Sequence, residues 1–383
     1  MSIPPTQART TDRMWKQAHW NMSRSWRALL AAVLVAGPLQ AAHACDDNRS
    51  TAAGFMPAKL CPLLDAPANH AANIHAIVVL RHGAIVAERY YTGTDRSIWS
   101  PWSRTVRFDA ATPHDLRSIT KSITSLLWGI AQGQGRTPPL ETPVLDLYPE
   151  LVGLKTGGRQ AVTLRHLFTM SSGLAWQEPV RYDASNDETG LFWRSSQVRY
   201  VFDRPVKNSG AGFNYNGGGT AVLADVLAQR VGMPLPDYAR THLFAPLGIS
   251  DWEWKEDVRG RPMAYAGLRM RPADLAKIGQ LVLQRGAWQG RQLVPAAWIA
   301  ESLRPHVQTG DGLQYGYQWW SGTVEAVGGK HQWHAGFGNG GQRVFIVPGL
   351  ELVVVVTAGG YDDMGSGRRA MGVFRAVAGA IVR

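Results

Sequence analysis

The sequence predicts one antiparallel sheet built from both ends of the chain, with an all-α subdomain inserted between them, an α/β plus all-α fold. A β-hairpin pattern near each end and a mostly helical pattern between them carry this prediction. The two hairpins are expected at 74–80 with 84–91 and at 343–347 with 351–357. Arg81-His82-Gly83 and Pro348-Gly349 supply the turns between their strands.

Amphipathic helices are expected between and after the hairpins. The clearest span residues 116–131, 220–230 and 272–285. Gly232 and Gly286 follow the last two, as glycine commonly follows a helix. At the end of the chain, four apolar side chains recur with helical spacing: Met371, Phe374, Val377 and Ile381. A helix there is expected to place one apolar face on the sheet.

The first 44 residues have the pattern of a secretory signal peptide, and we expect translation to start at Met14 or Met22. Basic residues precede the apolar run 29–39, and Ala42-His43-Ala44 provides a small-residue cleavage site. We expect 1–44 to be removed, 45–73 to form an N-terminal leader segment, and 74–383 to form the catalytic domain. The apolar run is too short for an ordinary transmembrane helix. The expected location is the periplasm or the exterior, with a lipid-anchored Cys45 as the alternative.

The charge of the chain argues against nucleic acid as a partner. A net charge of +11 falls to +7 without residues 1–44, which hold five basic residues and one acidic residue. The remaining excess is scattered, with no basic run that would follow phosphates. Cys45 and Cys61 are the only cysteines, too few for a zinc site, and they are a candidate disulfide in an oxidising compartment. No sequence pattern indicates a metal or cofactor, and oligomeric state is not encoded in any feature we identify.

Ser118-Ile119-Thr120-Lys121 opens the first expected helix, and it is the only Ser-x-x-Lys in the chain. Positions i and i+3 of a helix are neighbours, so Ser118 and Lys121 lie together. A serine hydroxyl becomes a good nucleophile when a base removes its proton. Lysine can be this base if burial and the helix N-terminus disfavour its charge. A solvated Ser/Lys face is the alternative for this motif alone.

Two Gly-rich segments are further candidates. Tyr215 stands on a strand-to-helix turn before Gly217-Gly218-Gly219, where its hydroxyl could relay a proton, or it could be a core tyrosine. His334-Ala335-Gly336-Phe337 precedes the strand at 343–347. Backbone N–H groups there could polarise a carbonyl oxygen, and a tight β-turn is the alternative.

The order Ser-x-x-Lys, Tyr-x-x, His-x-Gly resembles the serine β-lactamase and penicillin-binding-protein superfamily. The similarity spans roughly residues 74–382 and is greatest for the class C-like branch of esterases, D-aminopeptidases and 6-aminohexanoate-dimer hydrolases. It implies a β-lactamase-like fold and a metal-free acyl-enzyme mechanism with no cofactor. Ser118 would be the nucleophile, Lys121 its proton partner and Tyr215 the general acid/base. The oxyanion hole would combine the Ser118 N–H with one near Phe337, beside His334 and Gly336.

Some positions depart from the pattern of that superfamily. Gly217 stands where the tyrosine motif usually ends in Asn, and glycine there is expected to leave more room and to weaken β-lactam turnover. His334 replaces the usual lysine, as in several members of the branch. The literal Lys155-Thr156-Gly157 lies on the wrong side of Tyr215 and is interpreted as a loop. Tyr182 falls where oligoamide-cleaving relatives place a substrate-contacting tyrosine.

These features predict a serine hydrolase whose partner is a small ester or short amide. The alternatives are a D-Ala-D-Ala-type peptidase or a β-lactamase, or an envelope binding protein of the same fold that is acylated once and does not turn over its substrate. The chain contains neither Gly-x-Ser-x-Gly nor His-Glu-x-x-His, which argues against an α/β-hydrolase and against a common zinc protease. Its 15 tryptophans could line a carbohydrate cleft, but they are as readily core residues.

Overall fold

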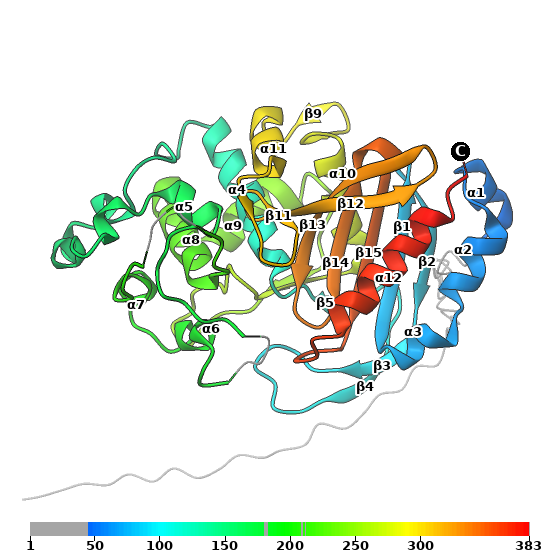
Figure 1. The fold of residues 1–383 in the computed structure, drawn as a ribbon, viewed down its shortest axis with the longest axis horizontal. Coiled ribbons are helices and arrows are strands. Elements are labelled where there is room, and N and C mark those ends of the chain that lie inside the picture. Colours follow the sequence, from blue (N-terminus) through cyan, green and yellow to red (C-terminus); the bar gives the residue numbers. More distant parts are fainter. Residues whose placement is uncertain (1–44, 180–182, 208–209, 211, 383) are drawn as a thin grey trace, which may run out of the picture. The chain divides into compact units, whose positions relative to one another are not determined.

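An eight-stranded antiparallel sheet organises the protein, in the order β10-β11-β12-β13-β14-β15-β1-β2 (Figure 1). The computed structural model describes residues 45–179, 183–207, 210 and 212–382. The sheet strands are β1 (Ile74–Arg81), β2 (Ala84–Tyr90), β10 (Val307–Gln308), β11 (Gln314–Tyr315), β12 (Trp320–Ala326), β13 (Gly329–Gly338), β14 (Gln342–Val347) and β15 (Leu352–Ala358). The predicted signal peptide and Tyr182 lie outside the described residues.

Strands from the two ends of the chain meet at the centre of this sheet. β15 pairs with β1, with Val354 opposite Val79 and Val356 opposite Ile77. Both strands are buried along their whole length. Their alternating side chains enter two separate cores, as the period of two along a strand requires. This confirms the prediction of one sheet assembled from both termini.

Each face of the sheet is covered by helices. The helix α12 (Ser366–Gly379) runs across one face in Figure 1, and Phe374 and Val377 enter the core there. The helices α1 (Asp47–Ala52), α2 (Pro57–Leu64) and α3 (Pro67–Ala71) form the segment expected as a leader. α2 contributes Leu60 and Leu64 to the same core, and Cys45 and Cys61 form a disulfide.

The other face carries the helical subdomain, and its core is shared with the sheet. Its α-helices are α4 (Ile119–Gly133), α5 (Leu164–Phe168), α6 (Asp187–Leu191), α7 (Gln197–Phe202), α8 (Gly217–Val231), α9 (Leu235–Ala239), α10 (Pro272–Leu283) and α11 (Ala296–Leu303). Shorter turns are η1 (Val144–Leu147), η2 (Pro149–Leu154), η3 (Arg159–Ala161), η4 (Arg240–Phe244) and η5 (Pro348–Leu350). Small sheets join β3 (Thr92–Asp95) with β4 (Arg104–Arg107), β5 (His114–Asp115) with β6 (Trp252–Trp254) and β7 (Leu268–Met270), and β8 (Ala287–Trp288) with β9 (Arg291–Gln292).

The expected hairpins and helices are present, with ends shifted by a few residues. The segment His334-Ala335-Gly336 precedes the strand at 343–347 as expected, and the alternative of a tight β-turn is wrong because these residues lie inside β13. β13 pairs with β12 on one side and with β14 on the other. Within the part of the chain that the structure describes, no helix is both long and apolar enough to cross a membrane.

Candidate active site

The Ser-x-x-Lys motif lies at the start of α4, between the sheet and the helical subdomain. Ser118 is the N-cap of this helix, and its side chain makes no capping hydrogen bond. Lys121, one turn later, donates a hydrogen bond from Nζ to Ser118 Oγ at 2.9 Å. Lys121 is 1% exposed, so the alternative of a solvated Ser/Lys face is wrong.

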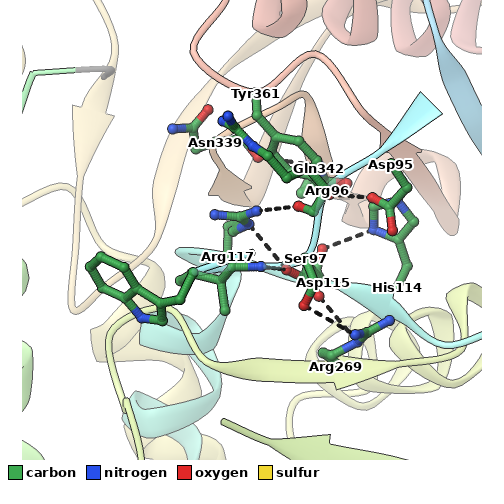
Figure 2. Close-up of polar contacts among 12 residues, drawn as sticks. Asp95, Arg96, Ser97, His114, Asp115, Arg117, Arg269, Asn339, Gln342 and Tyr361 are labelled. Carbon is green, nitrogen blue, oxygen red and sulfur yellow. Dashed lines mark hydrogen bonds and ion pairs between the residues drawn. The ribbon is translucent and has the colours of Figure 1, made fainter. Parts of the chain in front are cut away.

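The backbone immediately before Ser118 is held in an unusual conformation. Arg117 has φ of 49°, a left-handed conformation that is costly for a residue with a Cβ. Its guanidinium lies 3.3 Å from Asp115 Oδ2, donates to Arg96 O at 2.8 Å, and stacks on the ring of Tyr361 (Figure 2). Asp115 is in turn paired with Arg269 at 3.1 Å. These buried contacts offset the backbone strain and fix the direction in which Ser118 enters α4.

Tyr215 faces the same motif from the segment before α8. Its ring centroid lies 4.9 Å from Lys121 Nζ, and Tyr215 and Ser118 line the same cavity. Burial raises the pKa of Tyr215, although the nearby Lys121 opposes the shift. The phenol therefore keeps its proton at neutral pH and can donate it.

Two glutamates that the sequence analysis missed complete this cluster. Glu188, the second residue of α6, is fully buried and lies 3.0 Å from Lys121 Nζ through Oε2. Glu178 lies 3.6 Å from the same nitrogen through Oε1, and its side chain is 6% exposed. Both are far from Ser-x-x-Lys in sequence, and no motif marked them. The only sequence signal for the two glutamates was a pair of acidic residues a short distance apart, and such pairs are common by chance.

These carboxyl groups reverse the expected protonation of Lys121. Burial works to lower the pKa of this lysine, but Glu188, Tyr215 and Glu178 together raise it well above the ordinary value. The expectation of an amine neutralised by burial is therefore wrong. Burial and the neighbouring Glu188 raise the pKa of Glu178 to about 8, so Glu178 is protonated at neutral pH.

The expectation that Gly217 leaves empty space is also wrong. A Cβ added at Gly217 would overlap Glu188 Oε2 and would lie 3.0 Å from Glu178 Oε2. Gly217 N–H donates to Glu178 Oε2 at 2.6 Å, and Trp176 Nε1 donates to the same oxygen at 2.9 Å. The two carboxyl groups thus occupy the position of the missing side chain.

A cavity of about 340 Å³ opens on Ser118. Its wall includes Ser118, Glu178, Pro179, Tyr215, Trp320, Phe337, Gly338, Asn339, Gly340, Arg343, Asp363, Met364, Ser366 and Gly367. Arg343 is the one cationic side chain among these described residues, and burial lowers its pKa to about 10, so it remains charged.

The candidate oxyanion segment is only partly at this cavity. Phe337 and Gly338 line it, whereas His334 does not. His334 is 7% exposed, and burial lowers its pKa to about 4, so it is neutral. A Cβ at Gly336 would lie 3.1 Å from Ile119 Cγ2, so this glycine lets β13 approach α4. His75, Asp95 and His114 are the one group of potential metal ligands among the described residues, and none of them lines the cavity.

Comparison with known proteins places this geometry among related folds. The profile of the beta-lactamase family matches residues 66–376. A 6-aminohexanoate-dimer hydrolase from Paenarthrobacter ureafaciens is 25% identical over 301 residues, covering 73% of this chain and 71% of the relative. A family VIII carboxylesterase superposes with a TM-score of 0.62 at 15% identity, over 83% of this chain and 97% of that chain. A class C beta-lactamase superposes with a TM-score of 0.62 at 15% identity, over 88% and 98% of the two chains.

Proposed function

The chain belongs to the beta-lactamase family and is a hydrolase of that family, and we propose that it cleaves small esters or short amides through an acyl-enzyme on Ser118. One observation carries the proposal. The Ser118 hydroxyl lies at a cavity wall and accepts a hydrogen bond from Lys121 Nζ at 2.9 Å. A nucleophile in direct contact with a proton partner and open to a cavity is what covalent catalysis requires.

The neighbouring groups support assignments for the remaining roles. Tyr215 is protonated and lines the same cavity as Ser118, which suits it to protonate a leaving group. Ser118 stands at the first turn of α4, where backbone N–H groups lack partners within the helix. We assign the oxyanion hole to the Ser118 N–H and one N–H near Phe337, which lines the same cavity.

The cavity favours short substrates with an apolar portion. Tyr215, Trp320 and Phe337 supply an aromatic wall, and the Trp320 and Phe337 rings stack at 5.2 Å. Arg343 provides a fixed positive charge that suits a carboxylate at one end of the substrate. The curated relative is named for a 6-aminohexanoate dimer, and this supports amides as well as esters.

A panel of substrates tests the proposal and separates its alternatives. Many product equivalents per chain from p-nitrophenyl esters or short amides would support it, with Ser118→Ala as the background control. Cephalosporins are expected to react roughly ten- to a hundredfold more slowly in kcat/KM, because the carboxyl pair leaves no asparagine amide to position them. Comparable kcat/KM for a cephalosporin would favour a β-lactamase, and high D-Ala-D-Ala turnover would favour a peptidase. Release of a single equivalent of product per chain would indicate a binding protein that is acylated once and does not turn over its substrate.

We also propose export to the periplasm or the exterior. The basic and apolar pattern of residues 1–44 supports this, as does the Cys45–Cys61 disulfide, because disulfides persist mainly in oxidising compartments. Intact-mass analysis of the secreted or periplasmic protein should show Cys45 as the first residue. Recovery of an uncleaved chain from the cytosol alone would contradict it.

A further inference from the structure

The two carboxyl groups beside Lys121 are held in place by the loop that carries them. Asn186 caps α6 by accepting a hydrogen bond from Glu188 N–H at 2.9 Å, and it donates to Pro179 O at 2.9 Å. Gln177 N–H donates to Asp187 Oδ2 at 2.8 Å, and Asp187 N–H donates to Gln177 O at 2.8 Å. The segments that contain Glu178 and Glu188 are therefore bound directly to each other.

The charges in this cluster balance when one of the two carboxyl groups holds a proton. Two carboxylates and one ammonium would leave an uncompensated negative charge among buried groups, which is costly. Glu178 and Glu188 both face Lys121 Nζ, at 3.6 and 3.0 Å, and the raised pKa of Glu178 supports its neutral form. The resting cluster is then an ion pair between Lys121 and Glu188, with a protonated Glu178 beside it.

A charged Lys121 cannot act as a base by itself. An ammonium group has three N–H donors and no lone pair. Its donors are directed at Ser118 Oγ at 2.9 Å, Glu188 Oε2 at 3.0 Å and the backbone oxygen of Tyr265 at 2.9 Å. Of these oxygens, only the Glu188 carboxylate is basic enough to take a proton from Lys121 and leave a neutral amine.

We infer that Glu188 is the terminal proton acceptor when Ser118 is acylated. Glu188 does not contact Ser118 itself and acts through Lys121, which relays the proton. This inference rests on the proposed function. Before the attack, Lys121 passes one N–H proton to Glu188 Oε2, and rotation about the Cε–Nζ bond turns the freed lone pair toward Ser118 Oγ. As Ser118 Oγ bonds to the substrate carbonyl carbon, its O–H bond breaks and the proton passes to this lone pair of Lys121 Nζ. The carbonyl π electrons move to the oxygen, which becomes the oxyanion.

The proton returns when the intermediate breaks down. The oxyanion electrons re-form the carbonyl as the bond from the carbonyl carbon to the leaving group breaks, and the electron pair on the leaving atom takes the Tyr215 hydroxyl proton. Lys121 then reprotonates Tyr215, and Glu188 returns its proton to Lys121. The cluster is restored, and Ser118 remains acylated until water repeats the sequence.

Single-turnover acylation with a chromogenic ester tests the role of Glu188. Glu188→Gln keeps the shape but cannot accept the proton, so acylation should slow by roughly a hundredfold or more. Glu188→Asp retains a carboxylate and should recover part of that loss. Glu325→Gln removes one partner of the exposed pair with Lys330 and should leave acylation unchanged. Thermal unfolding of each variant shows whether the fold is retained.

The pH dependence of single-turnover acylation gives a second test. Because Glu188 takes the Lys121 proton inside the site, the wild-type acylation rate should change little between about pH 6 and 7.5. In Glu188→Gln, Lys121 can lose its proton only to solvent, so the acylation rate should rise with pH across this range. A wild-type rate that rises with pH as steeply as that of Glu188→Gln, or a folded Glu188→Gln that acylates at the wild-type rate, would overturn the inference. If the wild type never acylates Ser118, the proposed function fails instead.

Discussion

Glu178 is the residue whose ionisation most directly links the active site to stability. Burial and Glu188 raise the pKa of Glu178 to about 8, from an ordinary value of 4.5. Because the folded value is the higher one, the folded chain keeps a proton that the unfolded chain has already lost between these two pH values. The contribution of Glu178 to stability is therefore present below about pH 4.5 and lost as pH rises toward about 8.

Replacing this carboxyl with an amide should remove that dependence. Between pH 5 and 8, the free energy of unfolding of the wild type should fall relative to Glu178→Gln, which cannot ionise. Chemical denaturation of both proteins at several pH values measures the difference. Parallel curves across this range would show that Glu178 is already ionised in the folded chain at neutral pH.

At the scale of single residues, the sequence predicts the members of the site that a motif carries. Helical spacing places Ser118 beside Lys121, and a glycine-rich turn marks Tyr215. Glu188 contacts Lys121 from 67 positions away, and its identity depends on how the loop folds back. The protonation of Lys121 was mispredicted for the same reason. The helical pattern indicates that Lys121 is buried, but it gives no sign of the carboxyl groups that contact this lysine.

At the scale of elements, the close approach of β13 to the segment before α4 shapes the cavity. A Cβ at Gly338 would overlap the backbone oxygen of Leu116 and would lie 2.9 Å from Gln342 Cβ. Glycine therefore permits the contact that brings Phe337 and Gly338 to the cavity of Ser118. The contact joins the sheet to the helix that carries the nucleophile.

Gly338→Ala should push these elements apart. We expect a loss of about 1–3 kcal/mol in unfolding free energy, because overpacking against backbone cannot be relieved by a rotamer change. The kcat for the best ester should fall at least about tenfold, since a small displacement of reacting groups is costly. Gly310→Ala is the matched control, because a Cβ there meets nothing within 4 Å. Equal kcat in both variants would contradict this account of β13.

The elements at the two ends of the chain were predictable because their apolar runs are continuous and flanked by turns. β1 and β15 lie fully buried, so hydrophobicity alone identifies them. β12 and β13 were missed because their exposed and buried residues alternate irregularly and glycines interrupt them. A glycine-rich strand resembles a turn in sequence, and only its pairing with β12 and β14 distinguishes the two.

At the scale of the whole molecule, the segment before β1 is part of the folded domain. α2 packs into the core formed with α12, and the Cys45–Cys61 disulfide joins the residues before α1 to α2. No residue of α1, α2 or α3 lines the cavity of Ser118. The disulfide should therefore affect stability and leave catalysis unchanged.

Cys61→Ser should lower the free energy of unfolding by up to about 3 kcal/mol, the value expected for closing a loop of this length. Activity toward the best ester should stay at the wild-type level below the unfolding transition. Dithiothreitol should destabilise the wild type to a similar extent and have no further effect on Cys61→Ser. An unchanged unfolding midpoint for the variant would show that the disulfide does not stabilise the domain.

Covalent labelling tests whether Ser118 is the residue that becomes acylated. The chain is incubated with a slowly hydrolysed ester or a phosphonate, and its intact mass is measured before a peptic digest is sequenced by mass spectrometry. Pepsin is preferable because trypsin would cleave after Arg117 and Lys121 and leave only four residues. We predict one added acyl or phosphonyl group per chain, located on Ser118 and absent from a folded Ser118→Ala variant. A label on another residue, or undiminished ester turnover by folded Ser118→Ala, would contradict the mechanism.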